Sequence, residues 1–368
     1  MRIERVELRE IAGRLKTPFI TSFGSVQDRR ILLVRVEAEG LEGWGECGAE
    51  HAPDYSSETV DTAWTILTGF AVPALLGDGM SRPEEVPGRL GRIRGHPMAK
   101  AALEGAVWDL IARSQRAPLW KLLGGARRPV PAGVSVGLQT SERRLLDVVE
   151  GYLAEGYLRV KLKIEPGRDL KVVEAVRKRW PEVRLTADAN GAYRLEDGAH
   201  LRELDAFRLD FLEQPLAFDD LHDHARLANR IETPLCLDES IRHARDARLA
   251  IELRAAGVIN IKPGRVGGLS ESVAIHEVAR ERGIPVWCGG MLESGIGRAH
   301  NVALATLPGF TLPGDISASS RYWERDVVDP PWILRDGHLE APDRPGIGVE
   351  VDQQYLARMT VRTWTSGS

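Results

Sequence analysis

The sequence YLRVKLK at residues 157–163 is the first of five similar, largely apolar runs; the others are VRLTAD at 183–188, LDFLE at 209–213, PLCLD at 234–238 and GVINIK at 257–262. Each run ends in a charged residue, and successive ends lie 25, 25, 25 and 24 positions apart. One strand, one returning helix and two short loops occupy a period of this size. The stretch therefore predicts repeated βα units.

The runs are rich in Val, Ile and Leu and do not alternate strictly, which is typical of parallel strands covered by helices on both faces. Similar runs precede the repeat at 130–137 and follow it at 283–291 and 309–317. Eight such units predict a (β/α)8-like barrel, in which catalytic residues lie at the carboxyl ends of the strands. The charged closing residues all occupy such ends.

With 368 residues, the chain is long enough for about two domains, because a barrel needs roughly 200 residues. We expect an α/β protein with an α+β capping domain over residues 1–125, the barrel over 126–320, and a segment over 321–368 that packs back on the cap or the barrel.

Helical patterns in the cap cover 56–76, 82–94 and 97–114. A loop at 17–28, between two strand-like segments, carries Phe19 and Phe23. Aromatic side chains on a mobile loop often cover a ligand, and core packing is the alternative.

The composition limits the kinds of partner that this chain is expected to bind. The net charge is −4 and no long basic run is present, so neither nucleic acid nor an anionic membrane surface is expected. The three cysteines are scattered, which favours a reducing compartment. A charged N-terminus and the absence of a run of about 18 apolar residues argue against a signal peptide or membrane span. We expect a cytoplasmic homo-oligomer that acts on a small molecule.

In such a barrel, Lys163 ends strand two and Lys262 ends strand six, so the two lysines face each other across the mouth. Asp188, Glu213 and Asp238 end the three strands between them. A single acidic residue there could be a helix N-cap or a surface ion pair, but three converging carboxylates need a cation. Hard oxygen ligands favour Mg²⁺ or Mn²⁺.

This arrangement suits proton chemistry next to a carboxylate. A divalent ion can stabilise an enediolate, and a lysine whose pKa is lowered by nearby positive charge can take the α-proton. Lys161 and Lys163 point to the same side of their strand, so each disfavours charge on the other. Alternatively, Lys161 only supports the carboxylates or binds substrate.

The motifs VKLK, DAN, EQP, DES and IKPGRVGG resemble the muconate-lactonising subgroup of the enolase superfamily. KLKIEPG, NIKPGRVGG, PVWCGGM and LPGDISAS are closer still to the o-succinylbenzoate synthase and N-acylamino acid racemase family, and the resemblance covers essentially the whole chain. It implies a (β/α)7β barrel capped by an α+β domain.

By this resemblance, Lys163 and Lys262 are the acid/base groups on the two faces of the substrate, and Asp188, Glu213 and Asp238 bind Mg²⁺. Three further residues would support them: Lys161, Asn190 and Glu239. The implied substrate contacts are Phe23, Tyr55, Ser135, Arg265, Gly290 and Met291.

The resemblance favours o-succinylbenzoate synthase: dehydration of 2-succinyl-6-hydroxy-2,4-cyclohexadiene-1-carboxylate in menaquinone biosynthesis. Arg265, three residues after Lys262, keeps N-acylamino acid (N-succinylamino acid) racemase open as the main or a second activity. Asp315 is followed by Ile316 and Ser317, where dipeptide epimerases tend to carry Asp-x-Asp, so a free α-amino substrate is disfavoured. The alternative to an enzyme is a non-catalytic barrel that binds a carboxylate and a metal.

Overall fold

The computed structural model describes residues 1–21, 24–77 and 79–366. Its centre is a parallel sheet of seven strands that are neighbours in chain order. The strands are β5 (Gly133–Val136), β6 (Arg159–Lys163), β7 (Leu185–Asp188), β8 (Leu212–Glu213), β9 (Leu235–Leu237), β10 (Val258–Ile261) and β11 (Val286–Cys288). The register aligns Lys163 with Asp188 and Asp188 with Glu213, so the polar ends of β6, β7 and β8 lie side by side.

The prediction of an eighth strand at 309–317 is wrong, because this segment does not form a regular strand. This segment makes two isolated parallel bridges, from Phe310 to Val286 of β11 and from Gly314 to Ala132 next to β5. Pro313 has no N–H to donate, which is one reason why no continuous ladder forms. Because the segment bonds to both edges of the sheet, it still closes the barrel.

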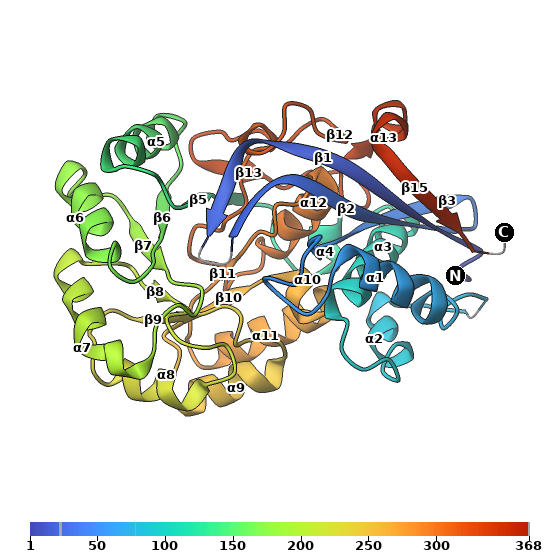
Figure 1. The fold of residues 1–368 in the computed structure, drawn as a ribbon. Coiled ribbons are helices and arrows are strands. Elements are labelled where there is room, and N and C mark those ends of the chain that lie inside the picture. The colour runs from blue at the N-terminus through green and yellow to red at the C-terminus, as the bar shows by residue number, and fades with distance from the viewer. Residues whose placement is uncertain (22–23, 78, 367–368) are drawn as a thin grey trace.

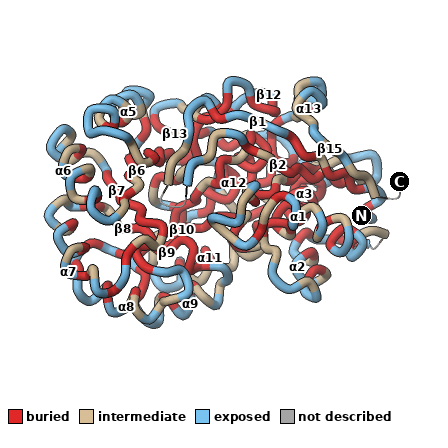
Figure 2. The backbone as a smooth tube through the Cα atoms, in the orientation of Figure 1, coloured by how far each residue is buried: buried red, intermediate tan, exposed pale blue. Residues whose placement is uncertain are grey.

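Helices lie outside the strands (Figure 1), and the strands themselves are buried (Figure 2). The helix α5 (Glu142–Ala154), for example, presents an apolar stripe inward that buries Leu145 and Val149, and the Ser141 side chain caps its first turn. Every residue of α12 (Gly295–Leu304), by contrast, is buried. The barrel helices are α5 (Glu142–Ala154), α6 (Asp169–Arg179), α7 (Gly198–Leu201), α8 (Leu221–Ala228), α9 (Ala244–Glu252), α10 (Pro263–Val266), α11 (Leu269–Glu281) and α12 (Gly295–Leu304), with 3-10 turns at Leu195–Asp197 and Arg202–Phe207.

The cap is built on an antiparallel sheet in the order β15-β1-β2-β3. Its strands are β1 (Arg5–Thr21), β2 (Gly24–Ala38), β3 (Leu41–Cys47) and β15 (Thr360–Thr365). The long helix α3 (Pro97–Ser114) begins with Pro97 at its first position, as predicted, and crosses β3 closely. A Cβ on Gly45 would lie 2.0 Å from the Ala102 carbonyl oxygen, so glycine is required there.

The helices expected at 56–76 and 82–94 are shorter than predicted. The first region contains α1 (Val60–Ile66), which continues as a π-turn at Leu67–Ala71. The second contains a 3-10 turn at Pro83–Glu85 and α2 (Val86–Arg89). Gly91 lies in the remainder of the second region, where glycine weakens a helix.

The prediction of a loop at 17–28 is wrong, because β1 and β2 form a long hairpin that extends to Thr21 and Gly24. The pairing shifts between Arg14 and Phe19, which accommodates Pro18. Near the tip, the Ile20 carbonyl accepts a hydrogen bond of 2.9 Å from Leu138 N of the barrel. The hairpin therefore reaches over the barrel mouth (Figure 1).

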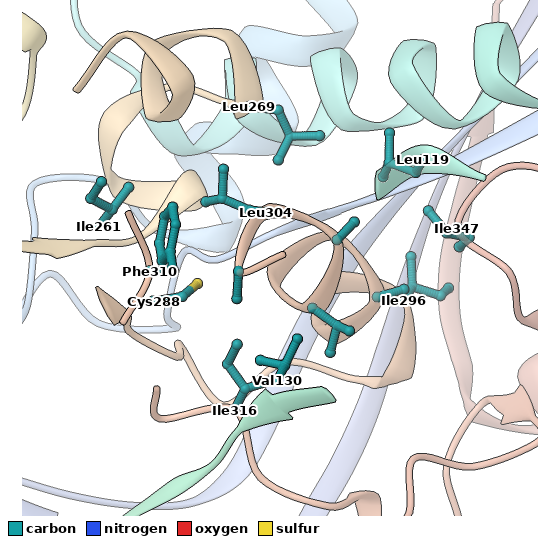
Figure 3. Close-up of a cluster of buried hydrophobic side chains, with 14 of the residues drawn as sticks. Leu119, Val130, Ile261, Leu269, Cys288, Ile296, Leu304, Phe310, Ile316 and Ile347 are labelled. Carbon is teal, nitrogen blue, oxygen red and sulfur yellow. The ribbon is translucent and has the colours of Figure 1, made fainter. Parts of the chain in front are cut away.

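The C-terminal segment packs on both parts of the molecule. β15 pairs with β1, with Trp364 opposite Leu8, and β13 pairs with β4. Ile347 belongs to the same buried cluster as Ile261 and Phe310 of the barrel (Figure 3). The remaining elements are α4 (Leu119–Leu122), β4 (Pro129–Pro131), a 3-10 turn at Ser319–Arg321, β12 (Val328–Asp329), β13 (His338–Glu340), β14 (Glu350–Val351) and α13 (Gln353–Met359).

We propose that the cap ends at residue 125, between α4 and β4, and that the C-terminal segment begins at residue 321. Continuous packing from Leu119 through the barrel cluster supports one joined molecule rather than two loosely linked bodies (Figure 3).

Candidate active site

The three acidic residues that end β7, β8 and the run at 234–238 are almost completely buried. The side chains of Asp188 and Glu213 are 0% exposed and that of Asp238 is 1% exposed. Isolated carboxylates at such depth would be strongly disfavoured, so each needs a cationic or hydrogen-bonding partner. The structure supplies lysines and an arginine.

Lys161 sits below the barrel mouth and holds three carboxylates. Its Nζ lies 3.0 Å from Asp188 Oδ2, 2.8 Å from Glu213 Oε2 and 2.8 Å from Asp315 Oδ2. Burial opposes its charge, but these three anions outweigh burial and raise its pKa. The expected lowering of a lysine pKa is therefore wrong for Lys161, and the geometry matches the alternative in which it supports the carboxylates.

Lys163 lies two residues after Lys161 on β6, nearer the barrel mouth. Its Nζ donates to Asp188 Oδ2 at 2.7 Å and to Asn190 Oδ1 at 2.6 Å. Asn190 also donates from Nδ2 to Glu239 Oε1 at 3.0 Å, so it links Lys163 to the loop after β9. Burial disfavours the charged form of Asp188, but Lys163 and Lys161 outweigh it and lower the Asp188 pKa.

Lys262 immediately follows β10, on the far side of the site. Its Nζ lies 2.7 Å from Asp238 Oδ2, 3.0 Å from the Tyr55 hydroxyl oxygen and 4.6 Å from the centre of the Tyr55 ring. Burial lowers the Lys262 pKa, whereas Tyr55 and Glu239 raise it by a larger amount. At Lys262, nearby phenolic and anionic groups therefore outweigh burial.

Arg265 is buried beside Asp238. Its guanidinium donates to the Ile241 carbonyl at 3.0 Å, to the Asn260 carbonyl at 2.7 Å and to Asp238 Oδ1. In this conformation the guanidinium is committed to Asp238 and the backbone rather than to the space between the lysines.

A cavity of about 140 Å³ lies between Lys163 and Lys262, under the hairpin tip. The Ser135 hydroxyl is buried there and has no hydrogen-bond partner in the described parts of the chain, which leaves it free for a substrate. Phe23 lies outside the described residues. The cavity is lined by other expected site residues and their neighbours: Phe19, His51, Tyr55, Ser135, Lys161, Lys163, Asn190, Lys262, Gly290, Met291, Asp315 and Tyr322.

Glycines make room for these groups. A Cβ on Gly289 would lie 2.7 Å from Lys262 Cε, and one on Gly290 would lie 2.5 Å from the Asp315 carbonyl oxygen. Larger residues at either position would displace the lysine or the loop.

Two family models match the chain. Residues 4–124 match the N-terminal domain of the mandelate racemase / muconate lactonizing enzyme family, and residues 144–355 match the enolase C-terminal domain-like family. The chain belongs to the enolase superfamily. The family resemblance that the motifs indicated is therefore confirmed, as is the barrel with its cap.

Superfamily relatives cover nearly the whole chain. An o-succinylbenzoate synthase of Geobacillus stearothermophilus is 52% identical over 97% of this chain and 96% of that protein. An N-succinylamino acid racemase of Thermus thermophilus is 52% identical over 98% of each chain. The solved structure of an enolase superfamily member from Listeria innocua matches with a TM-score of 0.96 and 42% identity, over 99% of each chain. Like these relatives, the chain is an enzyme.

Enolase superfamily members in this family depend on a metal ion. As placed, the described side chains contain no group of three His, Cys, Asp or Glu set around a common metal position. Their chemistry nevertheless fits a hard cation: burial, and then the charge of Asp188, raises the Glu213 pKa. Glu239 Oε2 is also buried without a hydrogen-bond partner among the described residues. Glu213 and Glu239 therefore offer buried carboxylate oxygens that a divalent ion would stabilise.

Sequence reasoning missed two site residues, Asp315 and Asn260. Asp315 ion-pairs with both Lys161 and Arg159, and Asn260 Nδ2 donates to Glu213 Oε1 at 2.8 Å. Asp315 falls in the eighth run, in phase with the other acidic ends, and that position was an available signal. The signal for Asn260 was weaker. It is a polar side chain inside an apolar strand run, and such a side chain needs a hydrogen-bond partner.

The described residues include no helix that is long and apolar enough to cross a membrane.

Proposed function

We propose that this chain is an o-succinylbenzoate synthase that dehydrates 2-succinyl-6-hydroxy-2,4-cyclohexadiene-1-carboxylate in menaquinone biosynthesis. The observation that carries the proposal is the pair of lysines on opposite sides of one small cavity, next to three buried carboxylates. Relatives with this printed name, 52% and 47% identical over almost their full length, support the choice of reaction.

Asp188, Glu213 and Asp238 would hold Mg²⁺ or Mn²⁺, which when bound supplies positive charge for a substrate carboxylate and its enediolate form. Lys163 takes the α-proton and returns a proton to the departing hydroxyl, since a syn elimination places both events on one face. Lys262 lies on the other face and stabilises the developing negative charge as an ammonium.

The remaining residues position these groups. Lys161 neutralises Asp188 and Glu213 from below, and Asn190 orients Lys163 through its 2.6 Å hydrogen bond. Tyr55 covers Lys262 from the cap side. The unpartnered Ser135 hydroxyl and the walls formed by Gly290 and Met291 would contact substrate. Phe23 stays a proposed substrate contact. Arg265, whose guanidinium is committed to Asp238 and the backbone, is proposed to act on the site through Asp238 rather than by direct contact.

N-succinylamino acid racemase is the second candidate, as the main or an additional activity. A racemase needs an acid/base group on each face of the α-carbon, and Lys163 and Lys262 satisfy this requirement. A relative with that printed name is 52% identical to this chain. Both reactions begin with removal of the same kind of proton, so one site could perform both.

The deciding experiment incubates the purified protein with Mg²⁺ and each substrate and compares kcat/KM for dehydration with kcat/KM for racemisation. A dehydration value well above the racemisation value supports the synthase, and the reverse order supports the racemase. A protein that binds Mg²⁺ but neither dehydrates nor exchanges an α-proton in D₂O would be a non-catalytic carboxylate-binding barrel instead.

We also propose that the enzyme works in the cytoplasm as a homo-oligomer. Its three cysteines are free and buried, which suits a reducing compartment. Size-exclusion chromatography with light scattering would measure the assembly.

A further inference from the structure

Three side chains outside the cavity form one hydrogen-bonded group: Asp169, Tyr193 and His200. The Tyr193 hydroxyl donates to Asp169 Oδ2, and His200 Nε2 lies 2.7 Å from the same oxygen. The Tyr193 and His200 rings stack with their centres 6.4 Å apart. Asp169 is 2% exposed and Tyr193 is 3% exposed, so this carboxylate is held almost entirely by protein groups. The hydrogen bond to Asp169 raises the His200 pKa, which favours a charged partner for the carboxylate.

The group joins the two segments that carry the Lys163 side of the site. Asp169 is the first residue of α6, six positions after Lys163. Tyr193 follows Asn190 by three positions, in the connection that leaves β7. The hydrogen bond between Tyr193 and Asp169 therefore fixes the loop after β6 relative to the loop after β7.

The backbone of Asn190 is held by its neighbours. Its φ angle is +45°, in the left-handed region that Asn adopts more readily than most non-glycine residues, and its N–H donates to Asp188 Oδ1 at 3.1 Å. The neighbouring backbone is anchored on one side, where Gly191 N donates to the Gln214 carbonyl at 2.7 Å. Tyr193 anchors the same connection on the other side. Because Asn190 Oδ1 accepts from Lys163 Nζ, a shift of this connection moves the partner of Lys163.

We propose that Tyr193, held by Asp169 and His200, is a positioning residue for Lys163 that acts through Asn190. The inference rests on the proposed function, in which Lys163 moves the α-proton. Lys262 takes its own contacts from Tyr55 and Asp238, which lie on other segments. Asn190 reaches the Lys262 side only indirectly, through its hydrogen bond to Glu239. Loosening the group is therefore expected to weaken proton transfer on the Lys163 face more than on the Lys262 face.

The test uses Tyr193→Phe, which removes one hydroxyl and keeps the ring. At saturating Mg²⁺, kcat for dehydration should fall about ten-fold, the scale seen when a supporting hydrogen bond behind an active-site group is lost, while KM changes by less than about two-fold. In D₂O, α-proton exchange should fall for the N-succinylamino acid enantiomer that Lys163 deprotonates and persist for its mirror image. A Lys262→Ala variant identifies the first enantiomer, because only the Lys163 face remains active in it.

Tyr355→Phe is the matched control, since it removes the same hydroxyl on α13, where the ring contacts Arg325. It should leave both assays unchanged. The proposal is overturned if Tyr193→Phe has wild-type kinetics at saturating Mg²⁺ or lowers the exchange of both enantiomers equally. Wild-type kinetics at saturating Mg²⁺ together with a raised Mg²⁺ requirement would place its effect on the metal ligands instead. If the wild-type protein neither dehydrates its substrate nor exchanges an α-proton, the proposed function is wrong and this inference fails with it.

If Tyr193→Phe does not fold, His200→Gln serves instead, because the His200 side chain is 36% exposed and its replacement disturbs the core less. The same one-sided loss of exchange is expected, and an equal loss on both faces overturns the proposal.

Discussion

Glu46 connects the cap to the barrel and should make the stability of the protein depend on pH. It lies on β3 and accepts hydrogen bonds from Ser294 N at 2.9 Å, Ser294 Oγ at 2.6 Å and Gly297 N at 2.9 Å, at the start of α12. Burial raises its pKa to about 7, and the nearby Glu293 charge adds to the shift that these hydrogen bonds oppose. In the unfolded chain the ordinary value of 4.5 applies.

The folded protein therefore binds this proton more tightly than the unfolded chain. The resulting stability is fully present below pH 4.5, is lost as the pH rises through 7, and is absent above about pH 8. A difference between pKa values of 4.5 and about 7 corresponds to about 3 kcal/mol of unfolding free energy, at roughly 1.4 kcal/mol per pH unit.

Glu46→Gln removes the ionisation and leaves a neutral group of the same shape. The amide also loses one acceptor facing α12, which costs about 1 kcal/mol at every pH. The informative quantity is thus the change in the variant's relative stability between pH 5 and pH 8. Relative to wild type, Glu46→Gln should gain about 2.5 kcal/mol over this interval, which for a chain of 368 residues corresponds to a relative Tm increase of about 3 °C.

The assay is thermal or urea unfolding of both proteins at the two pH values, with Glu281→Gln on the exposed end of α11 as the control. An equal Tm difference between Glu46→Gln and wild type at pH 5 and pH 8 would refute the reasoning, because it would show that Glu46 does not change its protonation preference on folding.

The other predictions concern the site and the interface between the cap sheet and α3. EDTA should abolish activity and Mg²⁺ or Mn²⁺ should restore it, while Asp238→Asn should be nearly inactive; full activity after exhaustive chelation would contradict the metal site. Lys163→Ala should abolish dehydration and racemisation, and Lys262→Ala should abolish racemisation; wild-type exchange of both enantiomers by either variant in D₂O would contradict the assignment of one lysine to each face. Gly45→Ala should destabilise the protein by more than about 2 kcal/mol in urea unfolding, because its Cβ would overlap the Ala102 carbonyl oxygen of α3, and an unchanged midpoint would show that α3 can move away.

The sequence by itself determined the barrel and most of its polar ends. Parallel strands with a regular period must place their carboxyl ends on one edge, so Lys163, Asp188, Glu213, Asp238 and Lys262 could be grouped without coordinates. The structure places Lys163, Asp188 and Glu213 side by side by strand register and sets Lys262 across the cavity. Local pattern was sufficient because each of these residues closes its own apolar run.

Only the tertiary structure decided the contacts between segments distant in the chain. Tyr55 comes from the cap to cover Lys262, and Asp315 reaches Lys161 from a segment that forms bridges rather than a strand. The pKa directions of Lys161 and Lys262 also followed from these neighbours, since the sequence pattern shows adjacent charges but not which groups enclose each lysine. The hairpin over the mouth was missed because Pro18 and nearby glycines indicate a loop locally, whereas pairing between β1 and β2 overrides that signal.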